Sequence, residues 1–200
     1  MSPRSAFSRI ALAAALAMVP ALASAHSRHG TIGFGHGFDH PMSGIDHILA
    51  MVTVGVFAAN LGGRALWAVP LTFMALMAAG GALGIAAMPL PFVEIGIALS
   101  IVVLGLVVAV RYEWPVAAAM TLVGLFAIFH GHAHGTEMPV DASGAAYALG
   151  FVLATGFLHL FGIAIGFGIS RAGERYSYKI TQAGGVATAF AGVLVLGAVI

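Results

Sequence analysis

Long apolar segments, separated by short polar connections, run along most of the chain. They lie near residues 42–61, 66–88, 92–110, 114–133, 145–169 and 180–200. Each is long enough for a helical membrane span, which needs about 20 residues. Strands of a membrane barrel would be about 10 residues long and would alternate in polarity, which these segments do not. The pattern therefore predicts an all-α, polytopic membrane protein with a six-helix transmembrane bundle.

The start of the chain has the pattern of a cleaved secretory signal. A signal needs a basic start, a short apolar core and a small-residue cleavage site, and these are present as Arg4 and Arg9, residues 10–19 and Ala23-Ser24-Ala25. The alternative is an uncleaved first helix, but the apolar core is short for a span. We therefore expect a signal peptide at 1–25 and a six-span transmembrane domain at 26–200.

A polar, glycine-rich stretch follows at residues 26–40, which we expect to be an arm outside the cytoplasm. Its histidines are able to gather metal ions. For His26 and His29, a solvated tail is the favoured interpretation.

Composition supports membrane insertion and excludes several classes of functional site. The chain is 60% hydrophobic and 8% charged, whereas soluble domains carry about 25% charged residues. The partner is therefore the lipid bilayer, and a net charge of +1 gives no indication of nucleic acid. The absence of cysteine excludes disulfides, thiolate metal sites and a cysteine nucleophile.

Basic residues predict the orientation, because cytoplasmic loops are rich in Lys and Arg. If the mature chain begins outside, the inner connections contain Arg64, Arg111, Arg171, Arg175 and Lys179. The outer segments then contain Arg28 alone. We therefore expect a multi-pass protein of the cell inner (plasma) membrane with both termini outside the cytoplasm.

This topology brings two polar motifs to the outer side of the membrane. His40, Asp46 and His47 stand at the head of the first apolar segment, and His130, His134 and Glu137 at the end of the fourth. The second set is spaced i, i+4 and i+7, so it forms one stripe if the helix continues, with His132 pointing away.

The first motif is also expected to be helical. Pro41 suits the first helical position, which would place His40 just before the helix. His40 and His47, seven residues apart, would then share a face, with Asp46 about 100° around the axis.

Ionisable side chains at membrane depth are costly, and they usually pair, bind ions or line a pathway. A set of imidazoles and carboxylates suits a borderline divalent cation such as nickel, cobalt, zinc or copper(II). Two further residues each have two interpretations. Glu94 is either a carboxylate at a helix start or a third contributor to the metal site. His159, deep in the fifth segment, is either a relay or a structurally bonded histidine.

Together, the stretch from His40 to His47 and the stretch Phe129-His130-Gly131-His132-Ala133-His134-Gly135-Thr136-Glu137 resemble the HupE/UreJ family of nickel permeases. The resemblance covers most of the mature chain. It implies Ni²⁺ uptake into the cytoplasm for nickel enzymes, the hydrogenases and ureases. It also implies functional roles for His40, Asp46, His47, His130, His134 and Glu137. Nickel rests on the resemblance alone.

The resulting hypothesis is an inner-membrane Ni²⁺ permease, with the ion as substrate and no permanently bound cofactor. One alternative is an intramembrane metal-dependent hydrolase or hydroxylase, which would use the same ligands with an open metal position. Another is a bis-histidine haem protein. An enzyme also needs a base and a polarising group beyond the ligands, and the sequence contains no clear set, so we expect no enzymatic activity.

Overall fold

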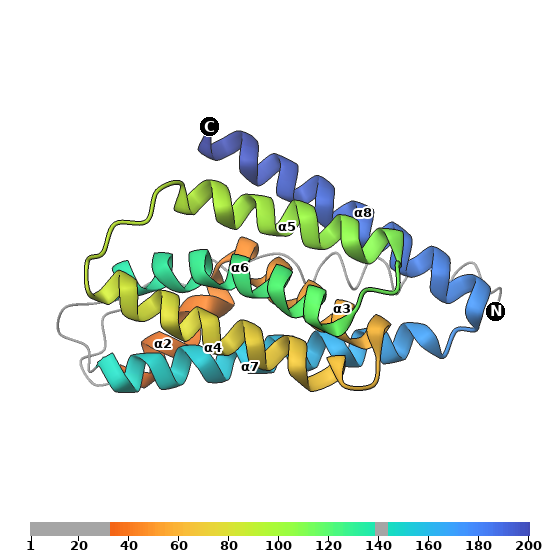
Figure 1. Cartoon of the computed structure of the whole chain (residues 1–200), viewed down its shortest axis with the longest axis horizontal. Coiled ribbons are helices and arrows are strands. Elements are labelled where there is room, and N and C mark those ends of the chain that lie inside the picture. Colours follow the sequence, from red (N-terminus) through yellow and green to blue (C-terminus); the bar gives the residue numbers. More distant parts are fainter. Residues whose placement is uncertain (1–32, 139–143) are drawn as a thin grey trace, which may run out of the picture. The chain divides into compact units, whose positions relative to one another are not determined.

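The computed structural model of the chain describes residues 33–138 and 144–200. Those residues form seven helices and no strands (Figure 1). The helices, in chain order, are α2 (Phe34–Ser43), α3 (Ile45–Leu61), α4 (Ala65–Ile85), α5 (Val93–Val110), α6 (Val116–Thr136), α7 (Gly144–Ser170) and α8 (Glu174–Val199). The predicted signal peptide at 1–25, together with His26 and His29, lies outside the described residues and stays a prediction.

Helix length supports a membrane protein with several spans. Within the described residues, α4 to α8 are each long and apolar enough to cross a membrane, and the bent pair α2–α3 would make a sixth span. The helix α3 alone has 17 residues, or about 25 Å of rise, at the lower limit for a span. The all-α membrane fold is therefore confirmed, and the six predicted segments correspond in order to α3 through α8.

The stretch before the first span differs from the prediction. Residues 34–40, expected to belong to the arm outside the cytoplasm, form α2 together with residues 41–43, and Pro41 lies inside this helix instead of opening the next one. The chain then turns by 84° between α2 and α3, because Gly44 adopts an extended conformation. His40 and His47 therefore belong to two different helices, and the prediction that they share one helix face is wrong.

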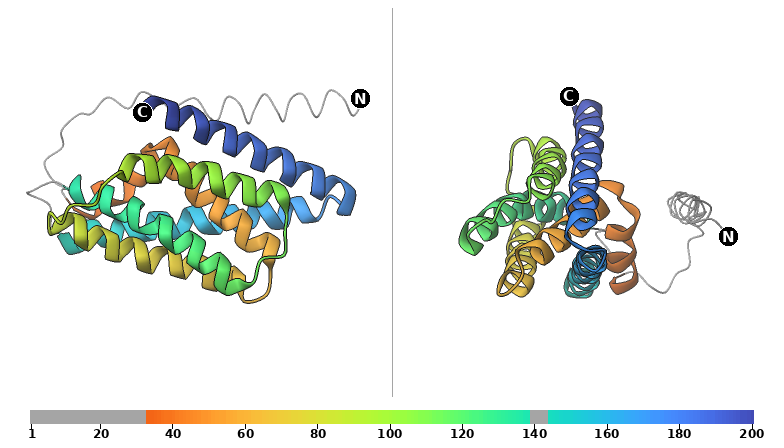
Figure 2. Two further views of the ribbon diagram at one scale, coloured as in Figure 1. Left: turned by 45° about the horizontal axis from the view of Figure 1, so that its top comes forward. Right: turned by 90° about the vertical axis from the view of Figure 1, so that its right-hand side faces the viewer.

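The helix α3 is at the centre of the bundle and contacts every other helix of the described chain. The closest helix pairs are α4 with α6, α5 with α8, and α7 with both α2 and α3 (Figure 2). The largest fully buried side chains of the core include Phe57, Phe73, Met51, Met77 and Ile101. The core therefore forms where α3, α4 and α5 meet.

Glycine lets the paired helices approach closely. A methyl group added at Gly80 would overlap the Ile128 carbonyl oxygen, and one at Gly162 would overlap the Val52 carbonyl oxygen. Membrane helices use such small residues to bring their backbones together. These contacts fix α4 against α6 and α7 against α3.

Successive spans run in opposite directions, so the bundle has two chemically different ends. The connections 62–64, 111–115 and 171–173 lie together at the right in Figure 1, and the connection 86–92 and the end of α6 lie at the left. The right-hand end, called the basic end below, carries Arg64, Arg111 and Arg171. The other end, called the histidine end, carries His134 near the close of α6.

Candidate metal-binding site

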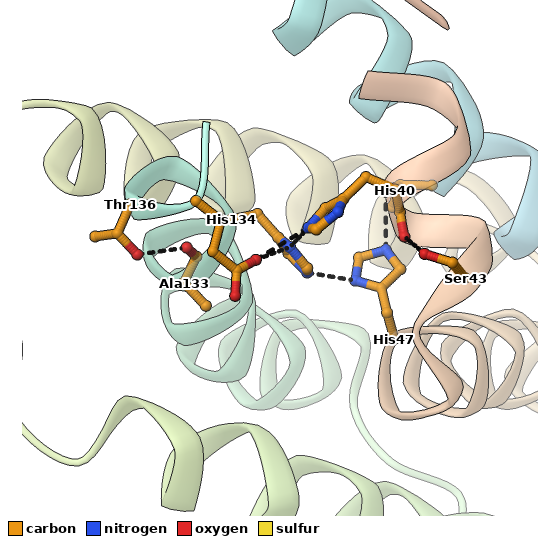
Figure 3. A network of polar contacts seen from close by, with 8 residues as sticks. His40, Ser43, His47, Ala133, His134 and Thr136 are labelled. Atoms are coloured by element: carbon orange, nitrogen blue, oxygen red, sulfur yellow. Dashed lines mark hydrogen bonds and ion pairs between the residues drawn. The ribbon is translucent and has the colours of Figure 1, made fainter. Parts of the chain in front are cut away.

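Three helices bring a cluster of histidines together at the histidine end. His40 comes from α2, His47 from the first turn of α3, and His130 and His134 from the last two turns of α6. Glu137 follows α6 directly. Figure 3 shows the rings of His40, His47 and His134 pointing toward one another from these three helices. Motifs about 90 residues apart in sequence therefore meet in one place.

The outer part of the cluster consists of His40, His134 and Glu137, which we call the outer trio. His40 Nε2 lies 3.0 Å from His134 Nδ1 and 2.9 Å from Glu137 Oε2, and the latter two atoms are 3.2 Å apart. Metal bonds of about 2.1 Å place neighbouring ligand atoms about 3.0 Å apart in an octahedral shell and about 3.4 Å apart in a tetrahedral one. The three atoms therefore already have the mutual spacing of one face of a coordination shell.

The inner part consists of His47, His130 and His134, which we call the inner trio. Their potential ligand atoms all lie within 4.8 Å of one another, and His134 Nε2 is 3.2 Å from His47 Nδ1. His47 and His130 are fully buried. His134 belongs to both trios, with Nδ1 in the outer and Nε2 in the inner one.

A serine hydroxyl orients His130. Ser100 Oγ lies 2.6 Å from the carbonyl oxygen of Ile97 and 2.9 Å from His130 Nε2. A hydroxyl has one hydrogen to donate, and here the Ile97 carbonyl takes it, so Ser100 Oγ accepts from His130 Nε2–H. The proton of His130 is therefore on Nε2. Its Nδ1, which is buried and has no partner among the described residues, carries a free lone pair.

A threonine hydroxyl lies against His47. Thr155 Oγ1 is 3.3 Å from His47 Nε2 and 3.7 Å from the sulfur of Met77. This contact holds the His47 ring with Nδ1 facing His134. Partners that orient a ligand histidine are a general feature of metal sites.

The inner trio has ligand atoms that face one another. His130 Nδ1 carries a lone pair, and His134 Nε2 lies 3.2 Å from His47 Nδ1. One proton lies between these last two atoms, because two lone pairs at that distance would repel each other. Metal binding would replace that proton, since a ligand imidazole must be neutral.

The carboxylate at the mouth of the cluster stays ionised over a wide range. The hydrogen bond from His134 lowers the pKa of Glu137 to about 2, with a further contribution from His40, against an opposing effect of burial. The side chain of Glu137 is 52% exposed. It therefore offers a permanent negative charge to a cation that arrives from solvent.

The remaining sequence-predicted positions lie outside both trios. Asp46 is half-buried beside His47, and Glu94 is exposed in the first turn of α5. His132 points away from the cluster, as the helical spacing predicted, and its Nε2 lies 2.7 Å from the Met88 carbonyl oxygen. Glycine in the motif serves packing, because a methyl group on Gly131 would overlap the carbonyl of Met77.

Sequence reasoning missed the two hydroxyl partners, Ser100 and Thr155. Both are fully buried in otherwise apolar helices. A lone hydroxyl in a membrane span is a weak signal, since it also bonds to its own helix backbone. Which imidazole each hydroxyl meets depends on how α5 packs on α6 and α7 on α3.

Known proteins are similar to this chain over most of its length. The family model described as HupE / UreJ protein matches residues 14–195. "Protein HupE" of Rhizobium leguminosarum bv. viciae is 44% identical over 190 residues, covering 95% of this chain and 98% of the relative. No solved structure matches the chain. On its motifs, its helices and this match, the chain belongs to the HupE/UreJ family.

Proposed function

We propose that the protein is a permease that imports Ni²⁺, with Co²⁺ as a second substrate, for the maturation of nickel enzymes. The HupE/UreJ family is a family of metal transporters, which supports transport over an enzymatic role. The membrane is the cell inner membrane, with both termini and the histidine end outside the cytoplasm. The basic residues at the opposite end support this orientation.

The observation that carries the proposal is the position of His134 between two sets of ligands. Its Nδ1 lies in the half-exposed outer trio and its Nε2 in the buried inner trio. An ion first binds Glu137 and His40 at the mouth of the cluster. It then moves to His47 and His130 by exchanging ligands, while it stays bound to the imidazole of His134. Stepwise exchange keeps each affinity moderate, which a transported ion requires because it has to leave again.

Asp46 and Glu94 have a supporting role in this proposal. Both lie toward the histidine end without belonging to either trio. Their negative charges would draw a hydrated cation toward the mouth, because charges of one sign around an entrance raise the local concentration of counter-ions.

The proposal is tested by Ni²⁺ uptake into liposomes that contain the purified full-length protein. His47→Ala and His134→Ala should each abolish most uptake, and the double variant should add little further loss, because residues that act as a unit are non-additive. His132→Ala is the matched control, since this histidine lies in the same motif but bonds to a backbone carbonyl. Uptake is normalised to the inserted protein.

Three outcomes would contradict the proposal. Near-normal uptake in either single variant would remove the shared site, and losses that multiply in the double variant would indicate two independent sites. Turnover of an added substrate without metal uptake would favour a metal-dependent enzyme.

A further inference from the structure

One buried histidine outside both trios has no hydrogen-bond partner among the described residues. His159 lies in α7, is 1% exposed and has no hydrogen-bond partner among the described residues for Nδ1 or Nε2. A neutral imidazole has one N–H to donate and one lone pair to offer. Leaving both unpaired in a membrane interior is costly, and such residues usually mark an ion pathway.

Four other buried polar side chains of the bundle already have hydrogen-bond partners. Thr53 donates to the Leu49 carbonyl oxygen, Ser100 and Thr155 hold the two histidines of the inner trio, and His132 bonds to Met88. His159 therefore offers a nitrogen lone pair with no assigned use, one step deeper than the inner trio.

His159 lies deeper in the bundle than the outer and inner trios. It follows Thr155 by four residues, so the two side chains lie on the same face of α7 about one turn apart. Thr155 itself contacts His47. The buried ring of Phe73 lies between His130 and His159. Its centroid is 5.8 Å from that of the His130 ring and 5.3 Å from that of the His159 ring.

The direction from the inner trio to His159 points toward the basic end of the bundle. The backbone carbonyl of His159 lies against Gly55 of α3, five residues before Asn60. Asn60 lines an open cavity of about 350 Å³ at the basic end, together with Arg111, Glu113 and Trp114. His159 is thus placed between the inner trio and a polar opening on the far side.

We infer that His159 is an inner transit site, which binds a divalent cation for a short time after the cation leaves the inner trio. The inference rests on the proposed function and extends it with one position along the path. A single imidazole, with water completing the shell, holds a divalent ion weakly. Weak binding suits a site that the ion must leave.

The test uses His159→Leu in the full-length protein and three measurements: Ni²⁺ uptake into liposomes, equilibrium Ni²⁺ binding in detergent, and thermal unfolding. Uptake should fall roughly tenfold or more, the range in which loss of a metal-site partner acts. Equilibrium binding should be unchanged, because both trios remain. The unfolding midpoint should be unchanged or raised, since an apolar side chain replaces unpaired polar atoms.

The matched control is His132→Leu. This change removes a buried histidine of the same bundle but leaves the Met88 carbonyl oxygen without its partner. It should therefore lower the unfolding midpoint while uptake per folded molecule is kept. The two variants thus separate a structural histidine from one on the path.

Wild-type uptake in His159→Leu would overturn the inference, and so would a parallel loss of binding and uptake, which would make His159 a ligand of the cluster. If His159→Leu fails to accumulate, His159→Gln decides by the same measurements, because an amide keeps the polarity but is a poor ligand for nickel. A wild-type protein that neither binds nor transports Ni²⁺ would instead refute the proposed function.

Discussion

At the scale of single residues, two hydroxyl groups hold the rings of the inner-trio histidines His47 and His130. Ser100 Oγ accepts the Nε2–H of His130, because its own hydrogen goes to the Ile97 carbonyl oxygen, and Thr155 Oγ1 lies 3.3 Å from His47 Nε2. Without such a partner, the proton of a buried imidazole would be free to occupy Nδ1, the atom on which metal binding depends. Tautomer control is therefore part of the site.

We predict that Ser100→Ala weakens Ni²⁺ binding roughly 10- to 100-fold, as for other partners of ligand histidines. The variant leaves the buried His130 Nε2–H without an acceptor, which should also lower the free energy of unfolding by about 1–3 kcal/mol. Equilibrium Ni²⁺ titration and thermal unfolding of the purified protein measure the two effects.

The control for this prediction is Thr53→Val. Thr53 is also buried and also donates to its own helix, but it has no hydrogen bond to a histidine of the described residues. Its replacement should leave Ni²⁺ affinity unchanged. Equal losses in both variants would mean that the hydroxyl acts through helix packing and not through His130.

At the scale of helices, the glycines of α6 set the distance between this helix and α4. A methyl group on Gly131 would overlap the carbonyl oxygen of Met77, and one on Gly135 would overlap that of Gly81. Both glycines stand next to a proposed ligand, His130 or His134. The glycines of the motif therefore hold the ligand-bearing face of α6 in register by close backbone packing.

Gly131→Ala should consequently destabilise the bundle by about 1–3 kcal/mol, as overpacking does in other cores, and should weaken Ni²⁺ binding because His130 and His134 shift together. Thermal unfolding and metal titration in detergent provide the measurement. Gly168→Ala in α7 is the matched control, since a methyl group there meets no atom within 4 Å. If Gly131→Ala matches this control in both measurements, the close approach does not govern the site.

At the scale of the whole molecule, the proposed metal site lies at one end of the bundle, so the pH on that side alone should govern entry. Glu137, at the mouth, has its pKa lowered to about 2. A carboxyl with a depressed pKa stays ionised until the pH approaches that value. Protonation between pH 7 and pH 5 therefore concerns the imidazoles, whose ordinary pKa is about 6.5.

We predict that the apparent Ni²⁺ affinity for uptake falls as the outside pH is lowered through roughly 6.5 to 5, because protons compete for the imidazole lone pairs. The measurement is initial uptake into liposomes of uniform orientation at several outside pH values, with the inside pH held constant. An affinity that does not change with outside pH over this range would exclude histidine as an entry ligand.

The sequence alone determined the class of the molecule and the residues that meet. Six long apolar segments cannot form a water-facing surface, so an all-α membrane bundle follows from composition and length. Helical spacing placed His130 and His134 on one face of α6 and turned His132 away, because the 3.6-residue repeat is a local property. Alternating span direction then brought His47 and His134 to the same end of the bundle.

The tertiary structure decided what depends on contacts between helices. The break at Gly44 and the packing of α2 on α7 determine the angle at which His40 meets the cluster, and no local pattern encodes that angle. The pairing of Ser100 with His130 and of Thr155 with His47 likewise depends on which helix faces which. The lack of a partner for His159 can be seen only after every neighbouring group has been placed, because hydrogen bonding in a membrane interior is a property of the whole bundle.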